Sequence, residues 1–198
     1  MKEKLTLRNV ILWGVASALL ILFLVSFGAT ATMKGVLGEG YGVITFKGAL
    51  WGASKMFFDV DGNAGSLFIP VVARHGSIPG IIGMILLFLS AGGLVAVTFL
   101  IKDEKLKKIL IFVCAGVILV ASVLLFFVGN VVFEAYAKYW RYEEGIPITA
   151  EQIKAYFRGS NYSVFGIIAG ILGILSAAGI VVSQLVIKDF KLIKSKEA

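Results

Sequence analysis

The 198-residue sequence contains only one cysteine, one histidine and three prolines. Cys114 lies inside an apolar run and has no partner, which excludes an intrachain disulfide. His75 has no second histidine or cysteine near it in the sequence, whereas a zinc site needs several such ligands. We therefore expect neither a disulfide framework nor a zinc centre, and we expect Cys114 to be a packing residue of a helix.

Charged residues are also scarce, at 16% of the chain, whereas hydrophobic residues make up 59% and the mean hydropathy is +0.94. An ordinary soluble domain is about 25% charged and about 45–50% apolar. A chain this short cannot bury such an excess in one core. Intrinsic disorder and a nucleic-acid partner are excluded on the same grounds, although the net charge is +7 and the pI is about 9.5. The composition predicts an integral membrane protein.

Four stretches have the ~20 apolar residues that a helix needs to cross a bilayer. These stretches are 10–33, 78–101, 109–133 and 163–187. We therefore predict a membrane all-α fold with a single domain over residues 1–198, a left-handed four-transmembrane-helix bundle with long loops at 34–77 and 134–162. The first stretch is too long for the apolar region of a secretory signal, so we interpret it as an uncleaved anchor.

Lysine and arginine cluster in three short segments at 1–9, 102–108 and 188–198. Cytoplasmic segments of membrane proteins carry such an excess. Both termini and the short turn are therefore predicted to be cytoplasmic and the two long loops extracellular, with the plasma membrane as the expected location. We also expect the lysines of the tail to attract anionic membrane lipids. The eleven cations of these segments are Lys2, Lys4, Arg8, Lys102, Lys105, Lys107, Lys108, Lys188, Lys191, Lys194 and Lys196.

Small residues follow helical spacing in two of the predicted spans. Membrane helices approach each other closely at such residues. Packing within the bundle is favoured, and a homo-oligomer interface is the alternative. The predicted packing residues are Gly166, Gly170, Gly173 and Ala177 in the fourth span, and Ala115, Ser122 and Gly129 in the third.

The two long loops have recognisable local patterns. Residues 41–47 and 66–72 are rich in β-forming residues, which predicts a small extracellular antiparallel β-sheet in the first loop. Residues 133–144 are predicted to prolong the third span as a helix, and a capping box at Thr149–Gln152 predicts a short helix to about Phe157. Asp59–Asn63 is similar to the start of a calcium loop but has no later bidentate glutamate, so an acidic turn is favoured over a calcium site.

Aromatic residues of the loops are the candidate interaction surface, with membrane anchoring as the favoured role for those of the second loop. They are Trp51, Phe57, Phe58, Tyr139, Trp140 and Tyr142.

The order of four spans, a long first loop with strands and a Gly48-Ala49-Leu50-Trp51 segment, and a third span prolonged outward resembles the claudin and peripheral myelin protein type. The resemblance is one of topology, since the two cysteines that follow this segment in claudins have no counterpart here. It implies a four-span bundle with an extracellular sheet.

The deep parts of the predicted spans contain no ionisable residue, and such residues usually mark ion paths and proton relays. The sequence also has no nucleophile with a base, no paired carboxylates and no metal cluster of the kind that catalysis needs. We expect no catalytic residue, cofactor or metal. The favoured hypothesis is a non-enzymatic multi-pass membrane protein that associates with a membrane-protein partner or with itself through its extracellular loops, as a subunit of a membrane complex. A small channel or transporter subunit is the alternative, and a pocket joining Glu134, Arg74 and His75 would favour a membrane-embedded enzyme instead.

Overall fold

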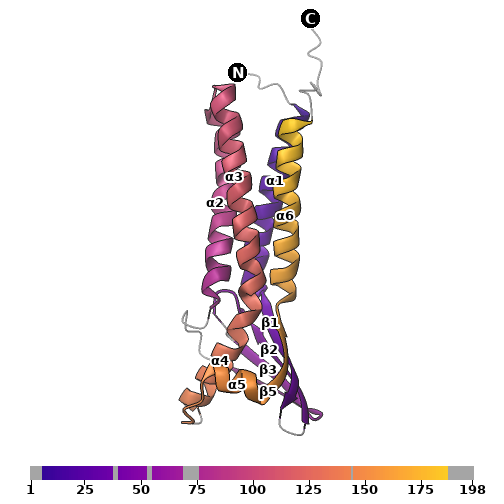
Figure 1. The fold of residues 1–198 in the computed structure, drawn as a ribbon, viewed down its shortest axis with the longest axis vertical. Helices are drawn as coiled ribbons and strands as arrows, with labels where there is room; N and C mark the ends of the chain where they lie inside the picture. Colours follow the sequence, from indigo (N-terminus) through magenta and orange to yellow (C-terminus); the bar gives the residue numbers. More distant parts are fainter. Residues whose placement is uncertain (1–5, 38–39, 53–54, 69–75, 144, 187–198) are drawn as a thin grey trace, which may run out of the picture.

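The computed structural model describes residues 6–37, 40–52, 55–68, 76–143 and 145–186. It consists of a bundle of four long helices and, at one end of the bundle, an antiparallel sheet with two further helices beside it (Figure 1). We call this second part the sheet domain. Arg74, His75 and the C-terminal lysines, for which the sequence made predictions, lie outside the described residues.

The bundle contains α1 (Leu7–Val25), α2 (Ile78–Leu100), α3 (Glu104–Leu125) and α6 (Val164–Leu185). All four are long and apolar enough to cross a membrane. Both α2 and α6 pack against α3, and both also pack against α1, which closes the bundle. Large side chains that are almost completely buried fill its centre, among them Leu12, Leu19, Leu87, Leu94, Ile111, Ile118 and Ile180.

Polar side chains fix where three of these helices begin. Ser77 accepts a hydrogen bond from the Gly80 N–H (3.2 Å), and Ser163 accepts one from the Gly166 N–H (3.2 Å). The Asp103 carboxylate accepts from the first turn of α3. These bonds satisfy N–H groups that the helix itself leaves without partners, which would be costly in an apolar environment.

The sheet has five strands in the order β4-β3-β2-β1-β5, and every neighbouring pair is antiparallel. Four strands come from the first loop: β1 (Thr30–Leu37), β2 (Gly40–Lys47), β3 (Lys55–Val60) and β4 (Asn63–Phe68). The fifth, β5 (Phe157–Tyr162), comes from the second loop and lies beside β1. The two loops therefore form one domain.

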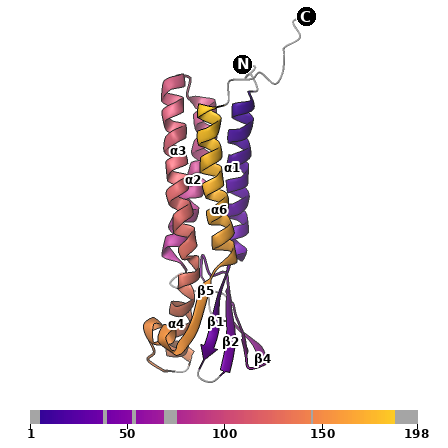
Figure 2. The same ribbon diagram turned by 45° about the vertical axis from the view of Figure 1, so that its right-hand side comes forward.

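Two helices cover one face of this sheet (Figure 2). After α3, a 3-10 turn η3 (Phe126–Asn130) leads into α4 (Val131–Glu143), and α5 (Ala150–Tyr156) follows. Apolar side chains of the helices and of the inward sheet face form a second core, which includes Ala31, Met33, Ile44, Phe46, Met56, Val132, Phe133, Tyr136 and Ile153.

Short connections attach the sheet domain to the bundle. The 3-10 turn η1 (Ser26–Gly28) joins α1 to β1, and β5 runs into α6 through Ser163 alone. The Ser163 hydroxyl donates to the Thr30 carbonyl (2.6 Å), and the Ser77 N–H donates to the Leu50 carbonyl (3.0 Å). Because these bonds link residues far apart in the sequence, they hold the sheet at the end of the helices.

The second loop is helical as predicted at α4 and α5, and the predicted capping box is confirmed: the Thr149 N–H donates to Gln152 Oε1 (2.8 Å) and the Gln152 N–H donates to Thr149 Oγ1 (3.2 Å). Two predictions were wrong. The first span was placed over 10–33, but its helix ends at Val25 and residues 30–33 belong to β1. The sheet was assigned to the first loop alone, but β5 adds a strand from the second.

Each error has a physical reason. Ala31 and Met33 of β1 are fully buried in the second core, where apolar residues are needed. In the sequence they therefore look like residues of a spanning helix. The sequence of β5, Phe-Arg-Gly-Ser-Asn-Tyr, lacks the β-branched residues that mark most strands. It is extended because β1 supplies a partner for its backbone groups.

Candidate interaction site

The outward face of the sheet is partly exposed. Side chains alternate between the two faces of a strand, so the residues next to those of the buried core point outward. In the described part of the chain no helix packs on this face. We call it the open face; it carries Thr32, Lys34, Val36, Tyr41, Val43, Thr45, Lys47, Lys55, Phe57, Asp59 and Tyr162.

Cross-strand contacts order the side chains of the open face. Tyr162, Thr32, Thr45 and Phe57 lie in one row across four strands. The hydroxyls of Thr32 and Thr45 share a hydrogen bond (3.1 Å). At the end of this row the Lys55 ammonium lies 5.1 Å from the centre of the Phe57 ring. Such cross-strand and cation–π pairs each stabilise a sheet by up to about 1 kcal/mol.

The open face is positively charged and partly apolar. Among its described side chains, Lys34, Lys47 and Lys55 are cationic and Asp59 is the only carboxylate. The pKa of Lys34 is raised above its ordinary value, mainly because its ammonium donates a hydrogen bond to the Tyr162 hydroxyl. Val36 and Tyr41 remain 42% and 57% exposed, so the face offers apolar contact area as well as charge.

The structure distributes the six predicted interaction residues over different places. Phe57 lies on the open face and is 40% exposed. Phe58 points to the opposite face, where it packs against the second core. Trp140 is half-buried and meets the Tyr136 ring edge-on at 6.0 Å between centroids. Tyr139 and Tyr142 belong to α4, and their side chains lie outside the described part.

Trp51 joins the sheet domain to the end of α1. Its indole N–H donates to the Ser26 hydroxyl (2.9 Å), and that hydroxyl donates to the Phe23 carbonyl (2.6 Å). Its ring stacks on Phe27 and meets Phe23 edge-on. Buried tryptophan needs a partner for its N–H, and Ser26 supplies one. Trp51 is therefore held within the chain.

The small-residue stripe of α6 faces α3 of the same chain. A Cβ atom on Gly166 would lie 2.5 Å from the Leu125 carbonyl oxygen, and one on Gly170 would lie 2.8 Å from the Phe126 ring. A Cβ atom on Gly173 would collide with the Ser122 hydroxyl, which donates to the Ile118 carbonyl of its own helix. The glycines thus allow close approach of the two helices.

The remaining predicted packing residues are also in contact within the chain. Ala115 and Ala177 are 4% and 6% exposed and belong to the core of the bundle. Gly129 lies in η3, where a Cβ atom would be 2.8 Å from Cα of Tyr162. Gly129 therefore packs against the end of β5 instead of another bundle helix.

The acidic turn at Asp59–Asn63 is a tight hairpin between β3 and β4. Asp61 and Gly62 have φ angles of 50° and 79°, as a two-residue hairpin turn of the primed type requires. One Asp61 carboxylate oxygen accepts the Tyr41 N–H (3.0 Å), which ties the turn to β2. Among the described residues no three histidine, cysteine or acidic side chains come together as metal ligands.

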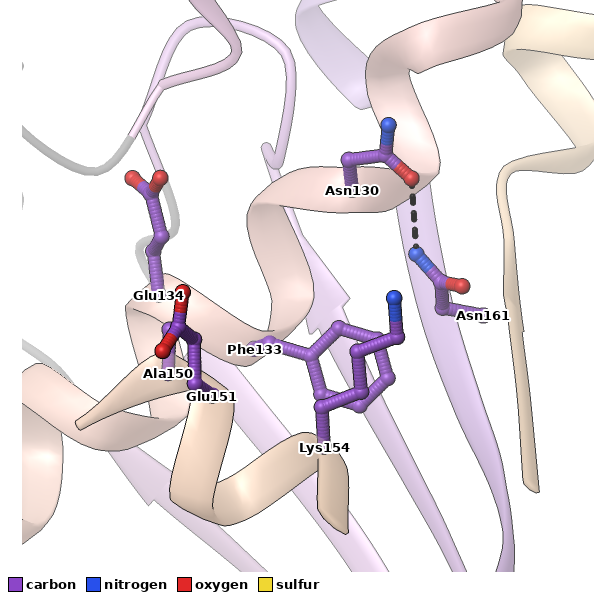
Figure 3. Close-up of a pocket in the computed structure, with 7 residues that line it drawn as sticks. All are labelled: Asn130, Phe133, Glu134, Ala150, Glu151, Lys154 and Asn161. Carbon is purple, nitrogen blue, oxygen red and sulfur yellow. Dashed lines mark hydrogen bonds between the residues drawn. The ribbon is translucent and has the colours of Figure 1, made fainter. Parts of the chain in front are cut away.

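Two shallow cavities lie where α4 leaves the bundle. One, of about 230 Å³, is lined by Asn130, Phe133, Glu134, Ala150, Glu151, Lys154 and Asn161 (Figure 3). The other, of about 200 Å³, is lined by Gly76, Ser77, Ile78, Pro79, Phe127, Asn130, Val131 and Glu134. We call the pair the junction groove. Glu134 was proposed from the sequence as a pocket residue, together with Arg74 and His75. The other lining residues come from the start of α2, from η3, α4, α5 and β5, which come together only in the folded chain.

Comparison of the chain with protein-family models and with curated proteins finds no match. The four apolar helices and the small antiparallel sheet are compatible with a claudin-like topology.

Proposed function

We propose that this is a non-enzymatic, claudin-like multi-pass protein of the plasma membrane that associates with a membrane-protein partner, or with a second copy of itself, through its open face. In this proposal the helices form a left-handed bundle, the termini and the α2–α3 turn are cytoplasmic, and the sheet domain is extracellular. The positive-inside pattern of the sequence supports the orientation.

The observation that carries the proposal is the asymmetry of the sheet. One face is sealed by α4 and α5, whereas the other leaves the large side chains of Val36, Tyr41 and Phe57 exposed on a rigid surface. Exposed tyrosine and phenylalanine are enriched at the cores of protein interfaces. The outer strands β4 and β5 also end the sheet, and sheet edges are sites of strand addition.

A small channel or transporter subunit is the alternative function, and the helices give it little support. The centre of the bundle is mainly apolar. Three of its buried hydroxyls bond to carbonyls of their own helices: Thr98 to Val95, Ser122 to Ile118 and Ser183 to Ile180. A conducting path would need polar groups that face one another between the helices.

Replacement of both Tyr41 and Phe57 by alanine is expected to weaken the association at least about tenfold, because truncation of a central aromatic side chain in an interface typically costs about 2 kcal/mol. The full chain is purified in mild detergent, its size is measured by light scattering, and co-purified proteins are quantified by mass spectrometry.

Ile146→Ala serves as the matched control, since Ile146 is similarly exposed (46%) but lies outside the sheet. Equal loss in both variants would contradict the proposal. A wild-type chain that is monomeric and conducts ions in liposomes would favour the channel hypothesis.

A further inference from the structure

The two halves of the junction groove share one wall. Asn130 and Glu134 line both cavities. They are four residues apart along continuous helical backbone, so they lie on the same side of it. The groove therefore passes over the start of α4, from the beginning of α2 on one side to α5 and β5 on the other.

The half beside α5 contains charges of both signs. Figure 3 shows the Lys154 ammonium on the side of the Asn130–Asn161 pair, and the carboxylates of Glu134 and Glu151 on the other side. The two amides are held together by a bond from Asn161 Nδ2 to Asn130 Oδ1 (3.0 Å). In the described part of the chain none of these three charged side chains forms an ion pair with another residue. They are thus positioned for a ligand that is itself positive at one end and negative at the other.

The half beside α2 is mostly apolar and lies at the end of the bundle. Ile78, the first residue of α2, is 71% exposed, and Phe127 of η3 is 46% exposed. On the other side, Asn161 lies just before the cap of α6. When apolar helices cross a bilayer, their ends lie at the level of the lipid headgroups. A groove at this level, with charges of both signs in one half and a mostly apolar lining in the other, matches a phospholipid.

We propose that the junction groove binds a phospholipid whose headgroup is a phosphate linked to a primary ammonium, as in phosphatidylethanolamine. The carboxylates of Glu134 and Glu151 accept hydrogen bonds from the lipid ammonium, and Lys154 donates to the phosphate. The acyl chains leave over Phe127 and Ile78. The proposal rests on the helices crossing a bilayer and is independent of the open face.

Headgroup selectivity provides the test. The ammonium of phosphatidylethanolamine donates three hydrogen bonds, whereas the quaternary ammonium of phosphatidylcholine donates none. Native mass spectrometry of the full chain in detergent, titrated with each lipid, measures both affinities. We expect phosphatidylethanolamine to bind about fivefold more tightly, the advantage of a hydrogen bond to a charged group at a partly exposed site.

Glu134→Gln is expected to lower the ratio of the two affinities, because it leaves Glu151 as the remaining carboxylate for the lipid ammonium. Lys154→Gln is expected to weaken both lipids alike, because both carry the phosphate. Glu104→Gln is the matched control, since Glu104 is an exposed carboxylate in the first turn of α3, at the other end of the bundle. All substituted residues are exposed, and unchanged circular dichroism verifies the fold.

Three outcomes overturn the proposal: equal affinity of the wild type for the two lipids, unchanged selectivity in Glu134→Gln, or the same loss in Glu104→Gln. A titration with soluble glycerophosphoethanolamine, which has the headgroup but no acyl chains, distinguishes a membrane lipid from a free headgroup compound as the ligand. Binding of this soluble compound as tightly as the lipid would identify a free phosphoethanolamine as the ligand instead.

Discussion

Replacement of Phe46 by alanine is expected to lower the free energy of unfolding of the sheet domain by about 4 kcal/mol, as is typical when a fully buried phenylalanine is truncated. Phe46 is 0% exposed and is the last but one residue of β2, with Ala31 of β1 and Met56 of β3 as its cross-strand neighbours. The cavity cannot close easily, because the strands on both sides are fixed by their own hydrogen bonds. Chemical denaturation in detergent, followed by tryptophan fluorescence, measures the loss.

Phe57→Ala is the matched control for this prediction. Phe57 is in the adjacent strand of the same sheet but on the open face, where 40% of its surface is exposed. We expect it to cost about 1 kcal/mol or less, the usual effect of a substitution outside the core. Equal destabilisation by the two variants would show that the open face is covered in the folded protein, and would contradict the assignment of the two faces.

Replacement of Gly166 by leucine is expected to destabilise the bundle by about 3 kcal/mol, the upper part of the range for overpacked cores. Its Cβ atom would be 2.5 Å from the Leu125 carbonyl oxygen and 3.2 Å from Cβ of Val128. Neither atom can rotate away, because both are fixed to the backbone of the facing segment. The α6 helix must therefore move outward, which also separates Gly170 and Gly173 from α3.

Gly179→Leu tests the same substitution in the same helix without the collision, since no atom lies within 4 Å of a Cβ atom there. We expect a change within about 0.5 kcal/mol. Thermal unfolding of both variants in detergent provides the comparison. If both variants unfold like the wild type, close packing of α6 on α3 is not what holds the bundle together.

The helices were predictable because their chemistry is local. Runs of apolar residues specify α2 and α6, and Ser77, Asp103 and Ser163 cap the helices that follow them. The α5 helix was equally predictable, since its capping box involves only neighbouring residues. None of these features requires contacts with distant parts of the chain.

The sheet and the site depend on contacts between distant residues. Residues 30–33 pair with the end of β2, and no local feature separates their apolar character from that of a spanning helix. Residues 157–162 form the strand β5 because their backbone pairs with β1 at the edge of the sheet. The sequence alone could not show that Phe57 points outward and Phe58 inward, because the direction of each side chain follows from the register of β3 with β2. The junction groove was missed for the same reason.

The central claim is that the sheet domain is extracellular and that the turn between α2 and α3 is cytoplasmic. Labelling of single cysteines in intact cells tests it most directly. In a variant with Cys114 replaced by alanine, a single cysteine is introduced at the exposed position Asp59 of β3 or at the exposed position Lys102 between α2 and α3. Intact cells are treated with a thiol reagent that does not cross membranes. The account predicts labelling of Asp59→Cys in intact cells and labelling of Lys102→Cys only after permeabilisation. Labelling of both positions in intact cells, or of Lys102→Cys alone, would contradict it.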